Sequence, residues 1–188
     1  RGGWPASTKL KEKAALRVAR NYVEEVINYD VHRVDGVDKN TTRVRKLLES
    51  YARNISTMAA NETIMADVRA TDQTISPNTF AIYLSALRRI FIVDDVPAWS
   101  PALRSKTKIR TSPKRHFVDP SIAVALMGTN PRGLLKDFPT FGFLFEDLCA
   151  RDLRVYAQAL DGEVYHYRDK NELECDLVVA LRDGRWGA

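Results

Sequence analysis

Long hydrophobic runs are absent from this chain of 188 residues. No stretch approaches the roughly 18 consecutive apolar residues that a membrane-spanning helix needs, and the first residues, RGGWPASTKLKEK, lack the apolar centre of a signal peptide. The apolar content of 45% is nevertheless normal for a chain that packs a core. We therefore expect a soluble, cytoplasmic protein with no membrane partner.

Cysteine and histidine are scarce, with two and three residues respectively. Cys149 and Cys175 each lie within an apolar pattern, which suits reduced, buried thiols better than a disulfide framework. The histidines are too scattered to predict a zinc cluster. The phosphate-binding pattern G-x-x-x-x-G-K-[ST] does not occur either, so we expect no ATP site and no resident cofactor within these residues.

The two ends of the chain carry opposite net charge. Residues 1–136 hold 23 Lys/Arg against 13 Asp/Glu, a net of +10, whereas residues 137–188 hold 6 against 11, a net of −5. This asymmetry predicts two modules, of which the first fits a polyanion and the second fits a metal or another cation. Solvated faces of differing sign explain the asymmetry equally well.

The first module shows apolar residues at intervals of three or four, which predicts amphipathic helices. Such stripes cover residues 9–29, residues 42–55 and a shorter segment from residue 61. A fourth helix is predicted to follow Ser76-Pro77, because serine caps exposed amides and proline fits the first helical position.

Two short apolar runs after these helices, residues 90–93 and 115–118, predict the strands of a hairpin. Helices followed by a two-stranded hairpin are the order of a winged helix. The connecting region is basic, since residues 97–118 contain six Lys/Arg and no acid, and it predicts a wing that lies along a phosphate backbone. A solvated loop or an interdomain packing module is the alternative. The six nucleic-acid-binding candidates are Arg104, Lys106, Lys108, Arg110, Lys114 and Arg115.

The second module is predicted to start with a helix over residues 121–127, which Gly128 ends, followed by the linker TNPRGLLKDFPT. A strand over residues 163–168, a turn and a strand over residues 172–180 then form a hairpin. In an extended second strand, Glu172, Glu174 and Asp176 share one face. Between linker and hairpin we predict a helix over residues 141–160, with a buried stripe of Phe141, Leu144, Phe145, Leu148, Tyr156 and Leu160.

Several short segments, in this order and spacing, resemble the C-terminal domain of unknown function of prokaryotic predicted AAA+ ATPases. The likeness covers essentially the whole chain. The segments are residues 2–5 (GGWP), 75–79 (ISPNT), 113–120 (PKRHFVDP), 142–148 (GFLFEDL), 167–169 (YRD) and 174–178 (ECDLV).

The resemblance implies a winged-helix-like module followed by a domain similar to restriction endonucleases. In that nuclease-like pattern, an acid on a helix, an acid on the central strand and a Glu-x-Lys on the next strand converge on a divalent metal. Glu146 matches the first acid and Asp176 the second, with Glu174 as an accessory ligand, and Mg²⁺ held there would activate water. A salt bridge for Glu146 and a hydrogen bond to a loop for Asp176 are the alternative roles.

The Glu-x-Lys pair is missing from these residues, which begin at Arg1 and stop at Gly187-Ala188. We interpret the chain as a fragment in which nuclease activity is lost, and we place the ATP site of the parent protein upstream of Arg1. The fragment alone is not expected to be an enzyme, whereas the parent is expected to hydrolyse ATP.

We therefore predict an α+β chain, with a helical winged-helix-like module over residues 1–120 and an incomplete restriction-endonuclease-like domain over residues 121–188. The predicted function is a target-recognition or regulatory module of a AAA+ ATPase, with DNA as the favoured partner. A remnant of a metal-dependent nuclease and a structural protein-interaction module are the competing hypotheses.

Overall fold

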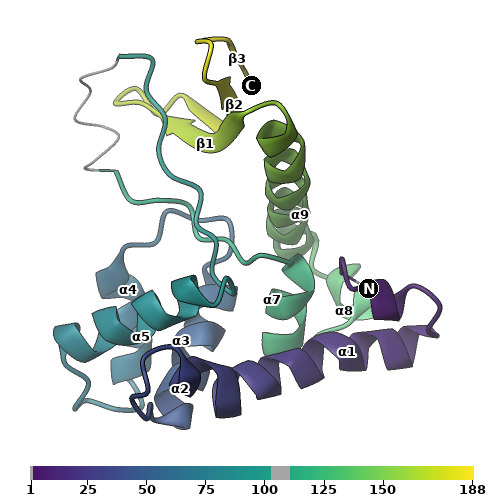
Figure 1. Ribbon diagram of the computed structural model, residues 1–188, viewed down its shortest axis with the longest axis vertical. Coiled ribbons are helices and arrows are strands. Elements are labelled where there is room, and N and C mark those ends of the chain that lie inside the picture. Colours follow the sequence, from purple (N-terminus) through teal and green to yellow (C-terminus); the bar gives the residue numbers. More distant parts are fainter. Residues whose placement is uncertain (1, 103–110) are drawn as a thin grey trace.

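Helices build most of the molecule, and a three-stranded antiparallel sheet follows them at the C-terminal end, which gives an α+β fold (Figure 1). The structure is a computed structural model and describes residues 2–102 and 111–188. The helices are η1 (Pro5–Ser7), α1 (Glu12–Glu25), η2 (Val26–Asp30), α2 (Val31–Arg33), α3 (Thr41–Arg53), α4 (Asn61–Arg69), α5 (Pro77–Arg89), α7 (Pro120–Leu126), α8 (Pro131–Leu134) and α9 (Phe138–Ala159). The strands are β1 (Gly162–Arg168), β2 (Glu174–Leu181) and β3 (Trp186–Gly187).

The first helical segment begins and ends three to four residues later than the predicted range of residues 9–29. It begins at Glu12 and continues past Tyr29, through the π-helical turn η2, into α2. The buried face of α1 is made by Ala15, Ala19 and Val23. None of the helices in the described ranges has both the length and the apolar content that crossing a membrane requires.

Helix starts follow the cap residues closely. The side chain of Ser76 accepts a hydrogen bond from the amide of Thr79, as predicted, and Pro77 occupies the first turn of α5. The pairs Asp119-Pro120 and Asn130-Pro131 start α7 and α8 in the same way. The helix α8 lies within the segment that was expected to be a plain linker, because a four-residue helix leaves no periodic pattern to detect.

The predicted strand over residues 90–93 is wrong, because this segment ends α5. Phe91 has a φ of 56°, its amide donates to the carbonyl of Arg88, and the amide of Ile92 donates to the carbonyl of Leu87. These two bonds define a Schellman motif, a helix end in which the left-handed position is usually glycine. The apolar segment Ile90–Val93 therefore forms the C-terminal end of α5, with phenylalanine at the position where glycine is common.

A narrow hairpin still connects the helices to the sheet. Antiparallel bridges join Val93 to Phe117 and Val96 to Lys114, although neither segment forms a continuous strand. The segment then continues to the sheet, since Ala98 forms a parallel bridge with His166 on β1. The strands of the sheet follow the order β1-β2-β3, and neighbouring strands are antiparallel. Between the pairs Tyr165–Val178 and Tyr167–Cys175, β2 has one residue more than β1, which forms a β-bulge.

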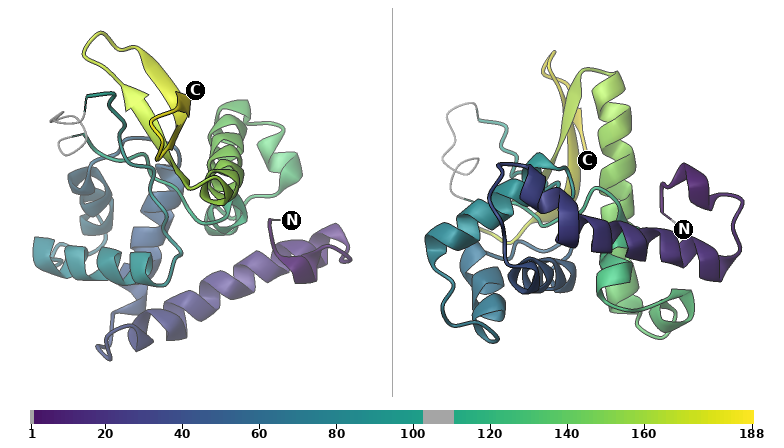
Figure 2. Two further views of the ribbon diagram at one scale, coloured as in Figure 1. Left: turned by 45° about the horizontal axis from the view of Figure 1, so that its top comes forward. Right: turned by 60° about the horizontal axis from the view of Figure 1, so that its bottom comes forward.

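Two apolar cores of unequal size stabilise the fold. Among the described residues, the larger one contains 24 buried residues, most of them from the helical segments α1 to α7, with others from the connecting loops and the hairpin and Leu144 from α9. The smaller one contains four buried residues, Val96, Ala150, Ala157 and Val164. Helix α9 packs along the sheet and also contacts α7 and α8, so it connects the two cores (Figures 1 and 2).

The predicted stripe of α9 is only partly buried. Leu144 is 5% exposed, but Phe145, Tyr156 and Leu160 are 56%, 63% and 65% exposed, and Phe141 is also exposed. The helix buries Asp147 and Ala150 instead, so its inner face is narrower and more polar than the sequence pattern suggests. We refer below to residues 2–133 as the helical part and to residues 138–188 as the sheet part.

Candidate functional site

Residues 113–119 form the segment at which the helical part, the sheet part and the hairpin meet. Four side chains of this segment are buried although they are charged or polar: Lys114, Arg115, His116 and Asp119. Buried polar groups are costly unless they are paired. Each of the four finds its partners in a different place, and together they define the polar centre of the molecule.

Lys114 is surrounded by carboxylates from the sheet part. Its ammonium nitrogen Nζ lies 3.0 Å from Oε1 of Glu146 on α9, 3.2 Å from Oε1 of Glu174 and 2.6 Å from Oδ1 of Asp176 on β2. The lysine side chain is 3% exposed. We call these four residues the lysine–carboxylate cluster.

The cluster forms because three elements present their polar side chains toward one point. The bridge between Val96 and Lys114 places the lysine in the hairpin, beside the sheet. Glu174 and Asp176 alternate along β2 and thus share a face, as predicted. Glu172, which was predicted to share that face, instead lies in the turn before β2 with a φ of 63°.

The charges in the cluster alter one another's protonation. Burial disfavours the charged lysine, but hydrogen bonds to Asp176 and Glu146 outweigh it and raise the pKa of Lys114. Burial raises the pKa of Glu146, and the ammonium of Lys114 only partly opposes that effect. Lys114 therefore stays charged at neutral pH. Arg168, whose Nη1 lies 3.9 Å from Oε2 of Glu174, adds a second positive charge at the edge.

These carboxylates do not fit a divalent metal as they are arranged. Mg²⁺ takes oxygen ligands, and the three side chains supply them. However, the position that all three share is occupied by Nζ of Lys114, and no group of three potential ligand side chains in the described ranges is placed to hold a metal ion. The residues that the resemblance assigns to a metal are thus brought together around a lysine.

Arg115 points to the opposite side, into the helical part. Its guanidinium donates to the hydroxyl of Tyr51 at 2.9 Å, to Oδ2 of Asp95 at 3.1 Å and to Oδ1 of Asn61 at 2.9 Å. It is one of the largest fully buried side chains. Burial, followed by the charge of Asp95, raises the pKa of Tyr51 well above its usual range, so its hydroxyl remains a neutral donor.

His116 pairs with an acid that the sequence did not single out. Its Nδ1 lies 2.7 Å from Oδ1 of Asp147, and the same oxygen accepts a hydrogen bond from the amide of Phe117 at 3.2 Å. Both side chains are almost completely buried, and burial raises the pKa of Asp147. Further along, Arg151 of α9 donates to Oδ2 of Asp119 at 2.7 Å.

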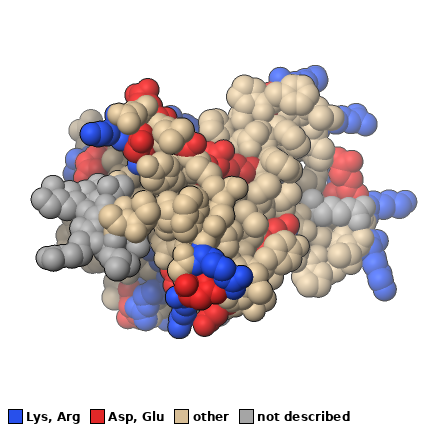
Figure 3. Space-filling view, turned by 90° about the horizontal axis from the view of Figure 1, so that it is seen from above, with Lys and Arg blue, Asp and Glu red and all other residues tan. Residues whose placement is uncertain are grey.

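The structure turns two of the six predicted nucleic-acid contacts inward. Lys114 and Arg115 are each 2% exposed and are paired within the protein, so neither faces solvent. The other four, Arg104, Lys106, Lys108 and Arg110, lie outside the described residues. The surface at the sheet end of the molecule, seen in Figure 3, carries acidic and basic side chains beside a broad uncharged area.

A cavity of about 430 Å³ opens beside the lysine–carboxylate cluster. Glu146 and Asp176 line one end, and apolar side chains that include Phe143, Phe145 and Leu177 line the rest. Cys149 also lines it, and both cysteines of the chain are free thiols. The sequence could not predict this cavity, because it requires α9 and β2 to be placed side by side.

The fold and the buried polar segment define an α+β protein in which a helical part and a small sheet part are joined by paired charges. Residues 1–133 match the family model described as "Domain of unknown function (DUF8612)", which is more than half of the 188 residues, and the chain therefore belongs to that family. Residues 141–188 match a second model, "Domain of unknown function (DUF4143)". No curated protein and no solved structure matches the chain.

Proposed function

We propose that the chain is a target-recognition or regulatory module of a prokaryotic AAA+ ATPase, in which the lysine–carboxylate cluster couples the helical part to the sheet part. The resemblance to C-terminal domains of such ATPases supports this proposal, and so do the matches to two family models that meet near the start of α9. In this proposal the ATPase domain precedes these residues in the parent chain.

The observation that carries the proposal is the position of Nζ of Lys114, within 2.6–3.2 Å of three carboxylates. The lysine belongs to the first family match, whereas Glu146, Glu174 and Asp176 belong to the second. A buried ammonium with several carboxylate partners fixes orientation, because separating the groups leaves the charge of Lys114, whose side chain is 3% exposed, without a partner in the protein interior. A movement of one part would therefore be transmitted to the other.

DNA is the partner that we favour. The order of α3, α4, α5 and the hairpin is compatible with a winged helix, and the first module carries the net positive charge of the chain. Because Lys114 and Arg115 are buried, the contribution of the basic loop to DNA binding would come from Arg104, Lys106, Lys108 and Arg110. The cluster itself serves as a coupling element and not as a hydrolytic centre.

The test compares the parent ATPase carrying Lys114→Met with the same protein carrying Lys170→Met. Lys170 lies in the exposed turn between β1 and β2 and is the matched control for loss of one positive charge. ATP hydrolysis is measured with and without duplex DNA. We expect DNA to change the rate in the wild type and in the control, and this response to fall at least fivefold in the Lys114 variant.

Circular dichroism of each variant checks that it is folded, and Lys114→Arg, which keeps the charge, should restore part of the response. An equal DNA response in all variants would contradict the coupling role. Mg²⁺-dependent DNA cleavage that is lost on Glu146→Gln would instead favour the nuclease hypothesis over the proposed function.

A further inference from the structure

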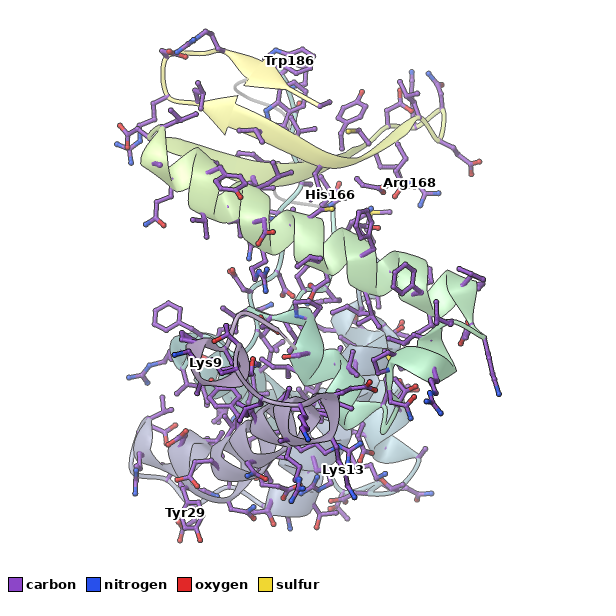
Figure 4. All side chains as sticks on the ribbon, turned by 90° about the vertical axis from the view of Figure 1, so that its right-hand side faces the viewer. Lys9, Lys13, Tyr29, His166, Arg168 and Trp186 are labelled. Atoms are coloured by element: carbon purple, nitrogen blue, oxygen red, sulfur yellow. The ribbon has the colours of Figure 1, made fainter. Side chains whose placement is uncertain are left out.

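A hollow of about 650 Å³ is lined by residues of α1 and by residues at the start of α8, two helices that lie close together in the ribbon diagram (Figure 1). Four basic side chains line it: Lys13, Arg17, Arg20 and Arg132. We call this hollow the α1–α8 groove. Figure 4 shows Lys13 on α1, at the far end of the molecule from Trp186 on the sheet. All the lining residues belong to the first family match.

The four basic side chains are exposed, and none of them has an ion-pair or hydrogen-bond partner among the described residues. Arginines elsewhere on the surface behave differently, since Arg43 pairs with Asp72 and Arg45 pairs with Glu24. Like charges three or four positions apart on a helix repel each other. The groove therefore concentrates positive charge that a bound anion would neutralise.

The spacing favours a polymer over a small anion. Lys13, Arg17 and Arg20 follow one another at intervals of four and three, so they lie along one face of α1. With a rise of 1.5 Å per residue, they span about 10 Å, which is longer than a single phosphate. Arg132 faces them from the other wall of the groove. A chain of phosphates would meet these groups in succession.

The chemistry favours nucleic acid over a membrane or an acidic protein segment. Three of the four cations are arginines, whose planar guanidinium donates two parallel hydrogen bonds to a phosphate. The charges line a concave surface, which a flat bilayer does not enter, and Leu16 is the one aliphatic side chain among the lining residues. Glu12, at the start of α1, repels phosphates and carboxylates alike, so the phosphate-binding surface begins after it, at Lys13.

We infer that the α1–α8 groove binds the phosphate backbone of DNA, independently of base sequence. This inference rests on the proposed function and gives DNA binding a location that the sequence analysis did not consider. The groove contacts phosphates only, so it positions the module on DNA, while sequence preference would arise elsewhere.

The experiment measures fluorescence anisotropy of a labelled 20-base-pair duplex of random sequence with the complete chain, over a series of salt concentrations. The four phosphate contacts of the groove contribute about −3.6 to the slope of log K against log salt. The double variant Arg17→Glu/Arg20→Glu should bind at least tenfold more weakly, with a slope shallower by about 1.8. Arg132→Ala, on the other wall of the groove, should make this slope shallower by about 0.9.

The matched control is Lys170→Glu/Arg182→Glu, which changes the net charge by the same amount at two exposed positions of the sheet part, outside the groove and outside the winged-helix elements. We expect it to bind within threefold of the wild type. Equal weakening in the groove variant and the control would overturn the groove and leave DNA binding intact. So would loss of binding confined to Lys106→Glu/Lys108→Glu.

Two further outcomes decide the matter. Absence of binding to the duplex at 50 mM salt would overturn both the groove and DNA as the partner of the proposed function. Binding to vesicles of anionic phospholipid without binding to the duplex would overturn the groove as a DNA site and assign it to a lipid surface. Circular dichroism of the double variants confirms that the effects do not arise from unfolding.

Discussion

The helical part and the sheet part are stabilised by different interactions. The helical part buries 23 of the 24 residues of the large core, whereas the small core has four buried residues. The sheet part is instead held by charge pairs that cross to the hairpin, through Lys114, His116 and Asp119. A core of this size contributes little by itself, so the sheet part depends on polar contacts whose geometry is specific.

The same truncation in the two cores should give the largest difference between the parts. Leu47, on α3, is completely buried, whereas Leu177, on β2, only packs against the small core from a half-buried position. We expect Leu47→Ala to lower the free energy of unfolding by about 4 kcal/mol and Leu177→Ala by about 1–2 kcal/mol. Chemical denaturation of both variants measures this, and equal losses would show that the two parts are equally well packed.

The polar contribution to the sheet part should depend on pH through Lys114. Its pKa is raised in the folded protein, so the stability that it adds is fully present below about pH 10.4, the ordinary lysine value, and is lost as the pH rises through the higher folded value. We expect Lys114→Met to be less stable than the wild type by about 2–3 kcal/mol between pH 7 and pH 9.

That difference should shrink as the pH rises from about 10.4, where the lysine of the unfolded chain begins to lose its proton, through the higher pKa of the folded protein. Urea denaturation at a series of pH values follows both proteins. Lys170→Met, in an exposed turn, serves as the control and should show no such dependence. A difference that stayed constant up to pH 12 would mean that packing of the lysine stem, and not its charge, is responsible.

The smallest expected effect concerns backbone strain at the ends of α5 and α7. Phe91 and Gly128 have φ values of 56° and 65° and occupy the same position in two Schellman motifs. Phe91 is 74% exposed, so Phe91→Gly removes few contacts and should stabilise the helical part by about 0.5–1 kcal/mol. Gly128→Ala should destabilise it by about 1 kcal/mol, because alanine disfavours a positive φ. The loss stays this small because no neighbouring atom obstructs the added carbon. Thermal unfolding resolves both changes, and a loss of stability in Phe91→Gly would contradict this view of the strain.

Sequence reasoning succeeded where local signals decide the structure. The cap at Ser76, the glycine stop at Gly128 and the alternation along β2 all act within a few residues, and each is present in the structure. The prediction failed for residues 90–93. β-branched and aromatic residues favour a strand, but the hydrogen bonds that end α5 and the burial of Ile92 hold this segment in a turn.

The candidate site shows the same division. Glu146, Glu174 and Asp176 were predicted to lie near one another, and the structure brings them together. Lys114 was assigned to the wing because six basic residues follow one another without an acid, and its burial depends on an antiparallel bridge that the sequence does not reveal. The sequence shows no pattern that predicts the buried pair of His116 and Asp147, because the two residues are 31 positions apart.

The distance along the chain between Lys114 and its partners also bears on the order of folding. Lys114 and Asp176 are separated by 62 positions, so the ribosome releases the lysine before Asp176 is synthesised. The helical part can assemble almost its whole core during that interval, while the lysine stays hydrated. We expect the sheet part to fold last, onto a helical part that is already formed. Proteolysis of arrested nascent chains would reveal this as early protection of α1 to α7.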